Sequence, residues 1–140
     1  MNKYKDFCEM FYVAHYLPIA LYNHTGFLCA YGFYEDMDPY PFVLSKLQTG
    51  DRPALYVSSD TGHYGLVMCP DNEHYFVLGP TYSTPVTEEI IRAYIKKNAI
   101  SPGRYGEIAS FLGGIPQYTY NHFINLLFLL LYLYIVEILR

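Results

Sequence analysis

The sequence predicts an α+β fold, in which helices flank a five-stranded antiparallel sheet and a long apolar helix follows at the C-terminal end. Three observations support this prediction. Five short segments are rich in β-branched and aromatic residues. Short turns join them into a group of two and a group of three, so neighbours within each group must be antiparallel. Helical periodicity or helix-capping signals mark most of the remaining segments.

The composition fits one globular domain with an aromatic core. Of the 140 residues, 52% are apolar and 16% are charged, so the chain can bury a sizeable core. The net charge is −4 and no cluster of Lys or Arg stands out, which argues against nucleic-acid binding by this chain alone. Tyrosine occurs 17 times and tryptophan is absent. Tyrosine rings suit a core, a pocket or an interface, because they combine apolar area with a hydroxyl.

The first half of the chain predicts a helix, a hairpin and a loop. Residues 3–17 carry an apolar stripe at helical spacing, made of Phe7, Met10, Phe11 and Ala14. Pro18 ends this helix. Residues 19–33 predict a hairpin, in which Gly26 supplies the positive φ of a tight turn. The loop after it predicts a short helix from Pro41 to Gly50.

The second half predicts three strands and three helices. The strands cover residues 54–60, 63–69 and 74–82. A helix follows over residues 84–98, with Thr87 as its cap and with charges that match the helix dipole, namely Glu88, Glu89, Lys96 and Lys97. The next helix covers residues 104–116 and ends at Gly113, Gly114 and Pro116. The last helix runs from about Tyr118 to the end.

The resulting order, α-ββ-α-βββ-ααα, is the general plan of the PAS and GAF families. On this plan, residues 1–117 form a PAS/GAF-like sensory domain. Residues 118–140 form a C-terminal helix that dimerises the chain or connects it to another part. We therefore expect a five-stranded antiparallel PAS/GAF-like sheet, flanked by helices, and a long apolar C-terminal helix.

The strand patterns predict a pocket for a small, mostly apolar or aromatic ligand. Gly65 removes a side chain in mid-strand, which opens room for a ligand or for a close backbone approach. The hairpin 19–33 would form one side of this cleft. The predicted ligand-binding residues are Tyr31, Phe33, Tyr56, His63, Tyr64, Gly65 and Phe76. The alternative is that the aromatic rings fill the space themselves and the sheet is a scaffold.

The last helix predicts a homodimer. Its uninterrupted apolar run, residues 126–136, is shorter than the roughly 20 residues that a membrane span needs, so no membrane association is expected. A helix that is apolar on all sides must be covered on all sides, and a second subunit is the economical cover. The predicted interface residues are Asn125, which would set the register, and Leu126, Leu130, Leu133 and Ile135.

No motif in the sequence predicts catalysis or a metal site. The chain lacks a nucleophile elbow, a phosphate-binding loop and a zinc-binding helix motif. None of the five histidines lies four residues from another on a predicted helix, and no two cysteines form a C-x-x-C pair. We expect neither an enzyme nor a cofactor. The cysteines are interpreted as buried thiols in a reducing cytosol, and the N-terminus shows no signal peptide, which together predict a cytoplasmic protein.

Three stretches together resemble a known family. They are "FYVAHYLPIALYNHTGFL", "HYFVLGPTY" and "GGIPQYTYNHFINLLFLLLYLYI". In this order they are similar to the N-terminal sensory region of AraC-type bacterial transcriptional regulators, in particular the branch of regulators of YSIRK-signal surface proteins. The resemblance implies transcription regulation, with DNA contacted only through a helix-turn-helix part that this sequence lacks. It implies no fixed set of ligand-binding residues.

Three functions remain open from the sequence. The first is a sensory and dimerisation module that binds a small molecule or relays a signal to the DNA-binding part. The second is a purely structural dimerisation domain without a ligand. The third is an enzyme of unknown type, which would need an acid, a base and a nucleophile aligned in one pocket.

Overall fold

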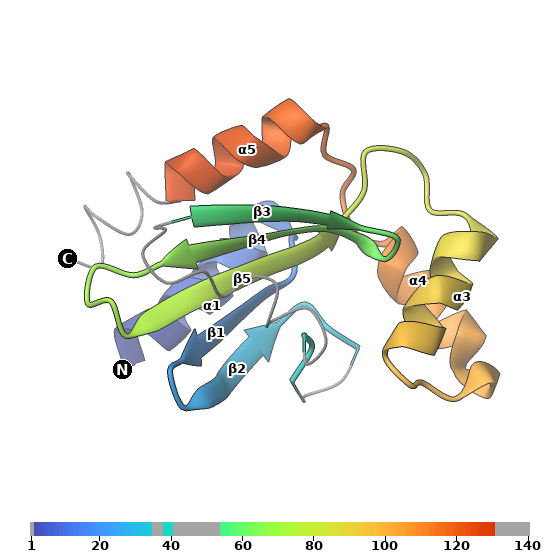
Figure 1. The fold of residues 1–140 in the computed structure, drawn as a ribbon, viewed down its shortest axis with the longest axis horizontal. Helices are drawn as coiled ribbons and strands as arrows, with labels where there is room; N and C mark the ends of the chain where they lie inside the picture. Colours follow the sequence, from blue (N-terminus) through green and yellow to red (C-terminus); the bar gives the residue numbers. More distant parts are fainter. Residues whose placement is uncertain (1, 35–37, 41–53, 131–140) are drawn as a thin grey trace.

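The computed structural model describes residues 2–34, 38–40 and 54–130 (Figure 1). Its helices and strands follow the predicted order: α1 (Asn2–His15), β1 (Ile19–Asn23), β2 (Gly26–Tyr31), β3 (Ala54–Ser59), β4 (Gly62–Met68), β5 (His74–Thr81), α3 (Glu88–Lys97), the short 3-10 helix η1 (Pro102–Arg104), α4 (Tyr105–Gly113) and α5 (Tyr120–Leu129). The short helix predicted from Pro41 to Gly50 lies outside the described residues.

The five strands form one antiparallel sheet in the order β2-β1-β5-β4-β3. The hairpin β1–β2 and the meander β3–β4–β5 meet where β1 pairs with β5, from Ile19 opposite Leu78 to Asn23 opposite His74. The hairpin turn has the predicted glycine, because Gly26 adopts a φ of +135°. The α+β class and the five-stranded antiparallel sheet are thereby confirmed.

Helix α1 packs on one face of the sheet, but its apolar stripe differs from the predicted one. The buried side chains are Tyr4, Phe7, Cys8 and Phe11, whereas Met10 is 47% exposed and Ala14 is also exposed. The buried side of α1 is therefore rotated relative to the predicted one. Its residues follow the spacing i, i+3, i+4, i+7 starting from Tyr4, whereas the predicted series starts from Phe7.

Helix α5 covers the same face of the sheet as α1. Its inward side chains, Phe123, Leu126, Leu127 and Leu130, belong to the same buried cluster as Phe7, Phe11, Val67 and Phe76. The helix begins where Thr119 accepts a hydrogen bond from the His122 N–H at 3.1 Å. The described part of the predicted long apolar helix is therefore an amphipathic helix, and the rest of that prediction lies outside the described residues. In the part of the chain that is described, no helix is long and apolar enough to span a membrane.

The opposite face of the sheet is covered by tyrosines. Tyr22 stacks on Tyr75 with ring centroids 5.5 Å apart, and Tyr40 meets Tyr64 edge-on at 5.7 Å. Tyr40 comes from the segment between β2 and β3, and its hydroxyl donates to the carbonyl oxygen of Gly79. Tyr22, Tyr40 and Tyr64 are each at most 1% exposed, so these rings close-pack.

Helices α3 and α4 pack against each other beyond one end of the sheet (Figure 1). Thr87 caps α3 as predicted, since its side chain accepts from the Ile90 N–H at 3.3 Å. After α4 the chain returns to the sheet, where the Tyr118 N–H donates to the Tyr82 carbonyl at 2.9 Å. Residues 114–119 thus tie the α3–α4 pair to both the sheet and α5.

Candidate functional site

The predicted pocket residues divide between the two faces of the sheet. Phe33 and Tyr64 belong with the tyrosine-covered face, whereas Tyr31, Tyr56 and Phe76 pack on the face that α1 and α5 cover. The seven predicted residues therefore do not line one space, although Tyr31 and Phe33 both line a hollow beside β2 that is described below. The single cleft predicted beside the hairpin is not formed.

The space above Gly65 is occupied by α5. A Cβ built on Gly65 would lie 2.6 Å from Cδ2 of Leu127 and 3.0 Å from its Cδ1. The glycine thus allows the helix to approach the sheet closely, which was the other function that a mid-strand glycine predicts. The interpretation of Gly65 as an opening for a ligand is wrong.

His63 and Tyr56 form a pair at the edge of the α5 interface. The Tyr56 hydroxyl lies 2.6 Å from Nδ1 of His63, and the two rings stack with centroids 5.7 Å apart. Burial lowers the pKa of His63, which favours the neutral imidazole, and burial likewise raises the pKa of Tyr56. The Tyr56 ring also contacts the rings of Tyr120 and Phe123 in α5 edge-on. The Tyr56–His63 pair therefore contributes to the packing of α5 on the sheet.

The predicted dimer residues of α5 have different environments. Leu126 and Leu130 are 6% and 0% exposed within a single chain, so their assignment to an interface between subunits is wrong. They pack on the sheet because the described part of α5 has one buried side. Asn125 is exposed, while Leu133 and Ile135 lie outside the described residues.

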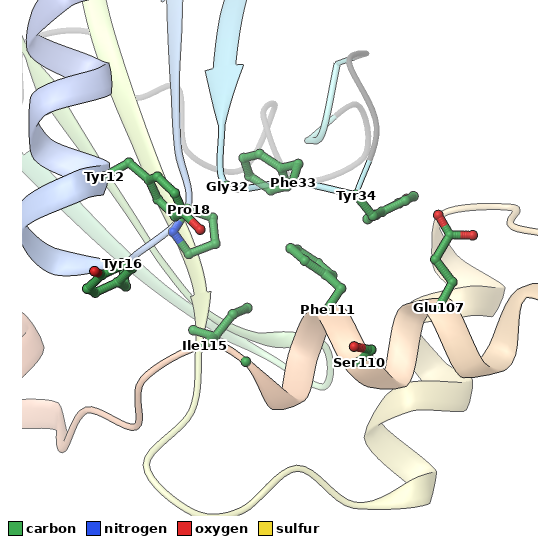
Figure 2. A pocket seen from close by; sticks show the side chains of 11 residues that line it. Tyr12, Tyr16, Pro18, Gly32, Phe33, Tyr34, Glu107, Ser110, Phe111 and Ile115 are labelled. Carbon is green, nitrogen blue, oxygen red and sulfur yellow. The ribbon is translucent and has the colours of Figure 1, made fainter.

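An aromatic cleft lies between the C-terminal end of α1, the residues after β2, and α4 (Figure 2). Of the predicted ligand-binding residues, Phe33 lines it, and the sequence did not predict the rest of its lining. Its volume is about 440 Å³. The residues that line this aromatic cleft are Tyr12, Tyr16, Pro18, Gly32, Phe33, Tyr34, Glu107, Ser110, Phe111, Gly114 and Ile115. They come from three parts of the chain that are distant in sequence.

The end of α1 places two tyrosines in the wall of the cleft. Tyr16 has a φ of +55°, which is uncommon for a bulky residue, and its N–H donates to the Tyr12 carbonyl at 2.7 Å. This left-handed residue ends the helix in the position that glycine usually takes. The Tyr16 ring remains 61% exposed and meets the Tyr12 ring edge-on at 6.1 Å. The end of the helix thus accounts for the backbone conformation of Tyr16, and its exposed ring forms part of the rim of the cleft.

Gly32 allows the residues after β2 to form the second side of the cleft. It has a φ of +85°, and a Cβ on it would clash with the Tyr12 ring. Only glycine satisfies both conditions, so Tyr12 rests directly on the backbone where β2 ends. The chain then directs Phe33 and Tyr34 toward α4 (Figure 2).

Phe111 of α4 is the centre of the third wall. Its ring centroid lies 5.8 Å from that of Phe33, 5.2 Å from that of Tyr34 and 6.0 Å from that of Tyr94. Phe33 in turn contacts Tyr40 edge-on at 5.5 Å, so the cleft adjoins the tyrosine-covered face of the sheet. The signals for this site in the sequence were a glycine followed by two aromatic residues and a phenylalanine late in a helix, which do not reveal their proximity.

Glu107 provides the charge at the rim. Its carboxylate accepts two hydrogen bonds from Arg104, from Nε to Oε2 at 3.0 Å and from Nη2 to Oε1 at 2.9 Å. These hydrogen bonds lower the pKa of Glu107. The Arg104 guanidinium also lies 5.3 Å from the centroid of the Tyr34 ring.

A second hollow of about 480 Å³ follows the outer side of β2, which is an edge strand among the described strands. Lys5 and residues 28–33 line it, and it shares Gly32 and Phe33 with the aromatic cleft. The aromatic residues that line this hollow, Tyr31 and Phe33, come from one stretch of the chain, whereas those of the aromatic cleft come from three. The aromatic cleft is therefore the better candidate for a ligand site.

The turn between β4 and β5 contains the group of described residues that most resembles a metal site, Asp71, Glu73 and His74. The Asp71 carboxylate already accepts hydrogen bonds from the backbone N–H groups of Glu73 and His74 and from the hydroxyl of Tyr4 at 2.9 Å. Nδ1 of His74 lies 2.6 Å from it. These hydrogen bonds, opposed by burial, hold the pKa of Asp71 well below its usual value. Asp71 thus stabilises the turn through these hydrogen bonds, and its hydrogen bond with Tyr4 connects the turn to α1.

The three cysteines form no disulfide. Cys8 and Cys69 are buried and Cys29 is half-buried, so their thiols contribute to the packing of α1 on the sheet.

Comparison with known proteins does not identify a family. The chain matches no family model, no curated protein and no solved structure.

Proposed function

We propose that this chain is the sensory module of a bacterial transcription regulator and that the aromatic cleft holds its small-molecule ligand. The observation that carries the proposal is the assembly of the cleft from α1, the end of β2 and α4. Two features support it. The five-stranded antiparallel sheet, with the strand order β2-β1-β5-β4-β3, supports the PAS/GAF-like plan that we expect from the sequence. The sequence resemblance to AraC-type sensory regions covers nearly all of the chain.

The volume and the aromatic lining of the cleft, which is open to solvent, support its proposal as a ligand site. Small-molecule sites are concave, mostly apolar and about 300–1,000 Å³ in volume, with a few polar groups that fix orientation. The cleft has five aromatic residues in its lining together with one carboxylate and the Ser110 hydroxyl. On the described part of the sheet, tyrosines cover one face, and α1 and α5 cover the other.

The cleft is also connected to the C-terminal side of the chain. Ile115 lines it, and the residues that follow lead through Tyr118 into α5. The Tyr118 hydroxyl lies 3.4 Å from the carbonyl oxygen of His15, next to Tyr16 of the cleft. A ligand that changes the spacing of α1 and α4 would therefore act on the start of α5. In this proposal the module is cytoplasmic and catalyses no reaction, and this chain does not itself contact DNA.

The cleft predicts a specific pattern in a thermal-shift screen of metabolites. We expect ligands that raise the Tm of the wild type and of Met10→Leu but not of Phe111→Leu. Phe111 lines the cleft, whereas Met10 is a 47% exposed apolar residue on α1 that does not line it and serves as the control. A ligand at about 100 times its Kd stabilises the folded state by about 2.7 kcal/mol, which raises the Tm by roughly 5–10 °C in a domain of this size. A screen without hits, or hits that survive Phe111→Leu, would contradict the proposal.

We further propose that the chain is a homodimer and that the outer side of α5 takes part in the interface. With Leu126 and Leu130 buried in the chain itself, the apolar surface left on this helix is Tyr120, 57% exposed, and Phe128, with Ile124 and Leu129 half-buried beside them. Asn125 lies on the same exposed side. Two such surfaces related by two-fold symmetry would cover each other.

Phe128→Glu is expected to convert the dimer to a monomer, because it places a charge in an apolar interface. Light scattering over a range of protein concentrations measures this change. Val13→Glu on α1 is the matched control, since Val13 is a 63% exposed apolar residue on another helix, and it should leave the dimer intact. A monomeric wild type would refute the dimer, and a dimeric Phe128→Glu would exclude this side of α5.

A further inference from the structure

The hollow along β2 and the aromatic cleft adjoin each other. The hollow is lined by Lys5 and residues 28–33, and it shares Gly32 and Phe33 with the cleft. Figure 2 shows these two shared residues where β2 leads into the cleft. Consecutive side chains of a strand point to opposite faces, so a hollow lined by a consecutive run of residues follows the edge of the strand. We call the hollow and the aromatic cleft together the β2 groove.

The edge of β2 is suited to pairing with a further strand. β2 is the outermost described strand on its side of the sheet, and alternate residues of such a strand direct their N–H and C=O groups away from the neighbouring strand. Residues 26–34 contain neither a charged residue nor a proline, the residues that often protect an edge strand. The irregularity in the pairing of β2 with β1 lies at Leu28, so residues 29–31 are regularly paired.

We propose that the β2 groove binds a short extended peptide with a free carboxyl terminus. This inference rests on the proposed function and adds the chemical class of the ligand. The peptide backbone pairs with β2 as an added strand, the N-terminal side chain of the peptide enters the aromatic cleft, and its carboxylate lies beside Lys5. In this mode of recognition, main-chain hydrogen bonds provide affinity and side-chain pockets provide specificity.

Lys5 gives the peptide its direction. It is the one charged residue in the lining of the hollow, it is exposed, and it forms no ion pair with another described residue. Tyr12 lies against Gly32 at the cleft, whereas Lys5 lies earlier on α1, and the starts of α1 and β2 are at the same end of the sheet (Figure 1). A peptide with its carboxylate at Lys5 and its first residue in the cleft therefore runs antiparallel to β2, as all paired strands of this sheet do.

The distance between Lys5 and the cleft sets the length of the peptide. Lys5 and Tyr12 are separated by about 10 Å along α1, because a helix rises about 1.5 Å per residue. An extended chain covers about 3.4 Å per residue, so about three residues span this distance. One further residue at each end places the carboxylate beside Lys5 and a side chain in the cleft. The β2 groove therefore fits a peptide of about five residues.

The first test screens a library of pentapeptides against the protein by affinity selection and mass spectrometry. The library is Phe-X-X-X-X with free termini, where X is any amino acid except cysteine. We expect the wild type to retain a subset of these peptides and Phe111→Leu, which alters the cleft, to lose them. The same peptides with a C-terminal amide should bind about twofold to fivefold more weakly, because they lack the charge that pairs with Lys5.

The second test examines strand pairing with N-methylated forms of the most strongly retained peptide. Alternate N–H groups of an added strand face β2, and N-methylation removes these donors. Methylation at the even positions and methylation at the odd positions should therefore differ. One pattern should weaken binding at least about tenfold, whereas the other should leave it nearly unchanged. Intermolecular NOEs between the peptide backbone and residues 29–31 should accompany binding.

The third test measures the affinity of the same peptide for two lysine variants. Lys5→Gln should weaken binding of the free acid by about twofold to fivefold and leave binding of the amide unchanged. Lys96→Gln is the matched control, since Lys96 is an exposed lysine on α3 that lines neither part of the β2 groove. Circular dichroism on each variant establishes that it is folded before its affinity is compared.

The outcomes separate this inference from the proposed function. A library from which no peptide is retained would overturn the inference, and the metabolite screen would then decide the proposed function separately. Equal effects of the two methylation patterns would overturn strand pairing with β2, and equal binding of acid and amide would overturn the role of Lys5. Peptides that bind Phe111→Leu as tightly as the wild type would show that the cleft is not part of their site.

Discussion

Tyr40→Ala is expected to lower the free energy of unfolding by about 3–5 kcal/mol, the usual cost of truncating a buried aromatic residue. Tyr40 is 1% exposed and packs against Tyr22, Phe33 and Tyr64. Its hydroxyl donates to the Gly79 carbonyl. The residue thus joins the segment between β2 and β3 to the tyrosine-covered face. Urea denaturation followed by circular dichroism measures the change.

Tyr40→Phe is the matched variant for this prediction. It keeps the ring and removes the hydroxyl that serves Gly79, so the expected loss is about 1–2 kcal/mol. The two variants separate ring packing from the hydrogen bond. If Tyr40→Ala were no more destabilising than Tyr40→Phe, the tyrosine-covered face would not be close-packed, and an internal ligand pocket on that face would again have to be considered.

Gly79→Ala is expected to destabilise the fold by about 3 kcal/mol or more, or to prevent folding. Two independent constraints act at this position. Gly79 has a φ of +118°, which side chains rarely adopt, and an added Cβ would lie 2.6 Å from the backbone oxygen of His63. Because the obstructing atom is backbone of the adjacent strand β4, it cannot move aside as a side chain would. Thermal unfolding monitored by circular dichroism tests this.

Gly106→Ala is the matched control. Gly106 lies in α4 with no atom within 4 Å of an added Cβ. The same substitution there should stabilise the chain by about 0.4–1 kcal/mol, since alanine has less conformational freedom to lose on folding. Effects of equal sign at the two glycines would contradict the close approach of β4 and β5 at Gly79.

These variants also bear on where a ligand could bind. The tyrosine-covered face is filled by the chain itself, so the candidate site is the peripheral cleft beside α4. Phe33 contacts both Tyr40 and Phe111, so it is a direct contact between the two regions.

The sequence by itself determined the local elements of this protein. Alternation along β1 separates the two faces, with Ile19 and Leu21 on the face that α1 and α5 cover and Ala20 and Tyr22 on the tyrosine-covered face, because the side-chain period of a strand is a property of the local backbone. The hairpin turn at Gly26 and the cap at Thr87 were predictable for the same reason, since each depends on one residue's φ or one side-chain oxygen.

Tertiary structure decided what lies against each face, and there the sequence predictions were incomplete. Both a ligand and a helix can use the space above Gly65, and only the docking of α5 places Leu127 there. Leu126 and Leu130 likewise suit a core or a subunit interface equally well by composition. The aromatic cleft joins Tyr12, Phe33 and Phe111, which are separated by tens of residues and carry no local mark of proximity. Such contacts depend on how whole elements pack, and periodicity along the chain contains no information about that packing.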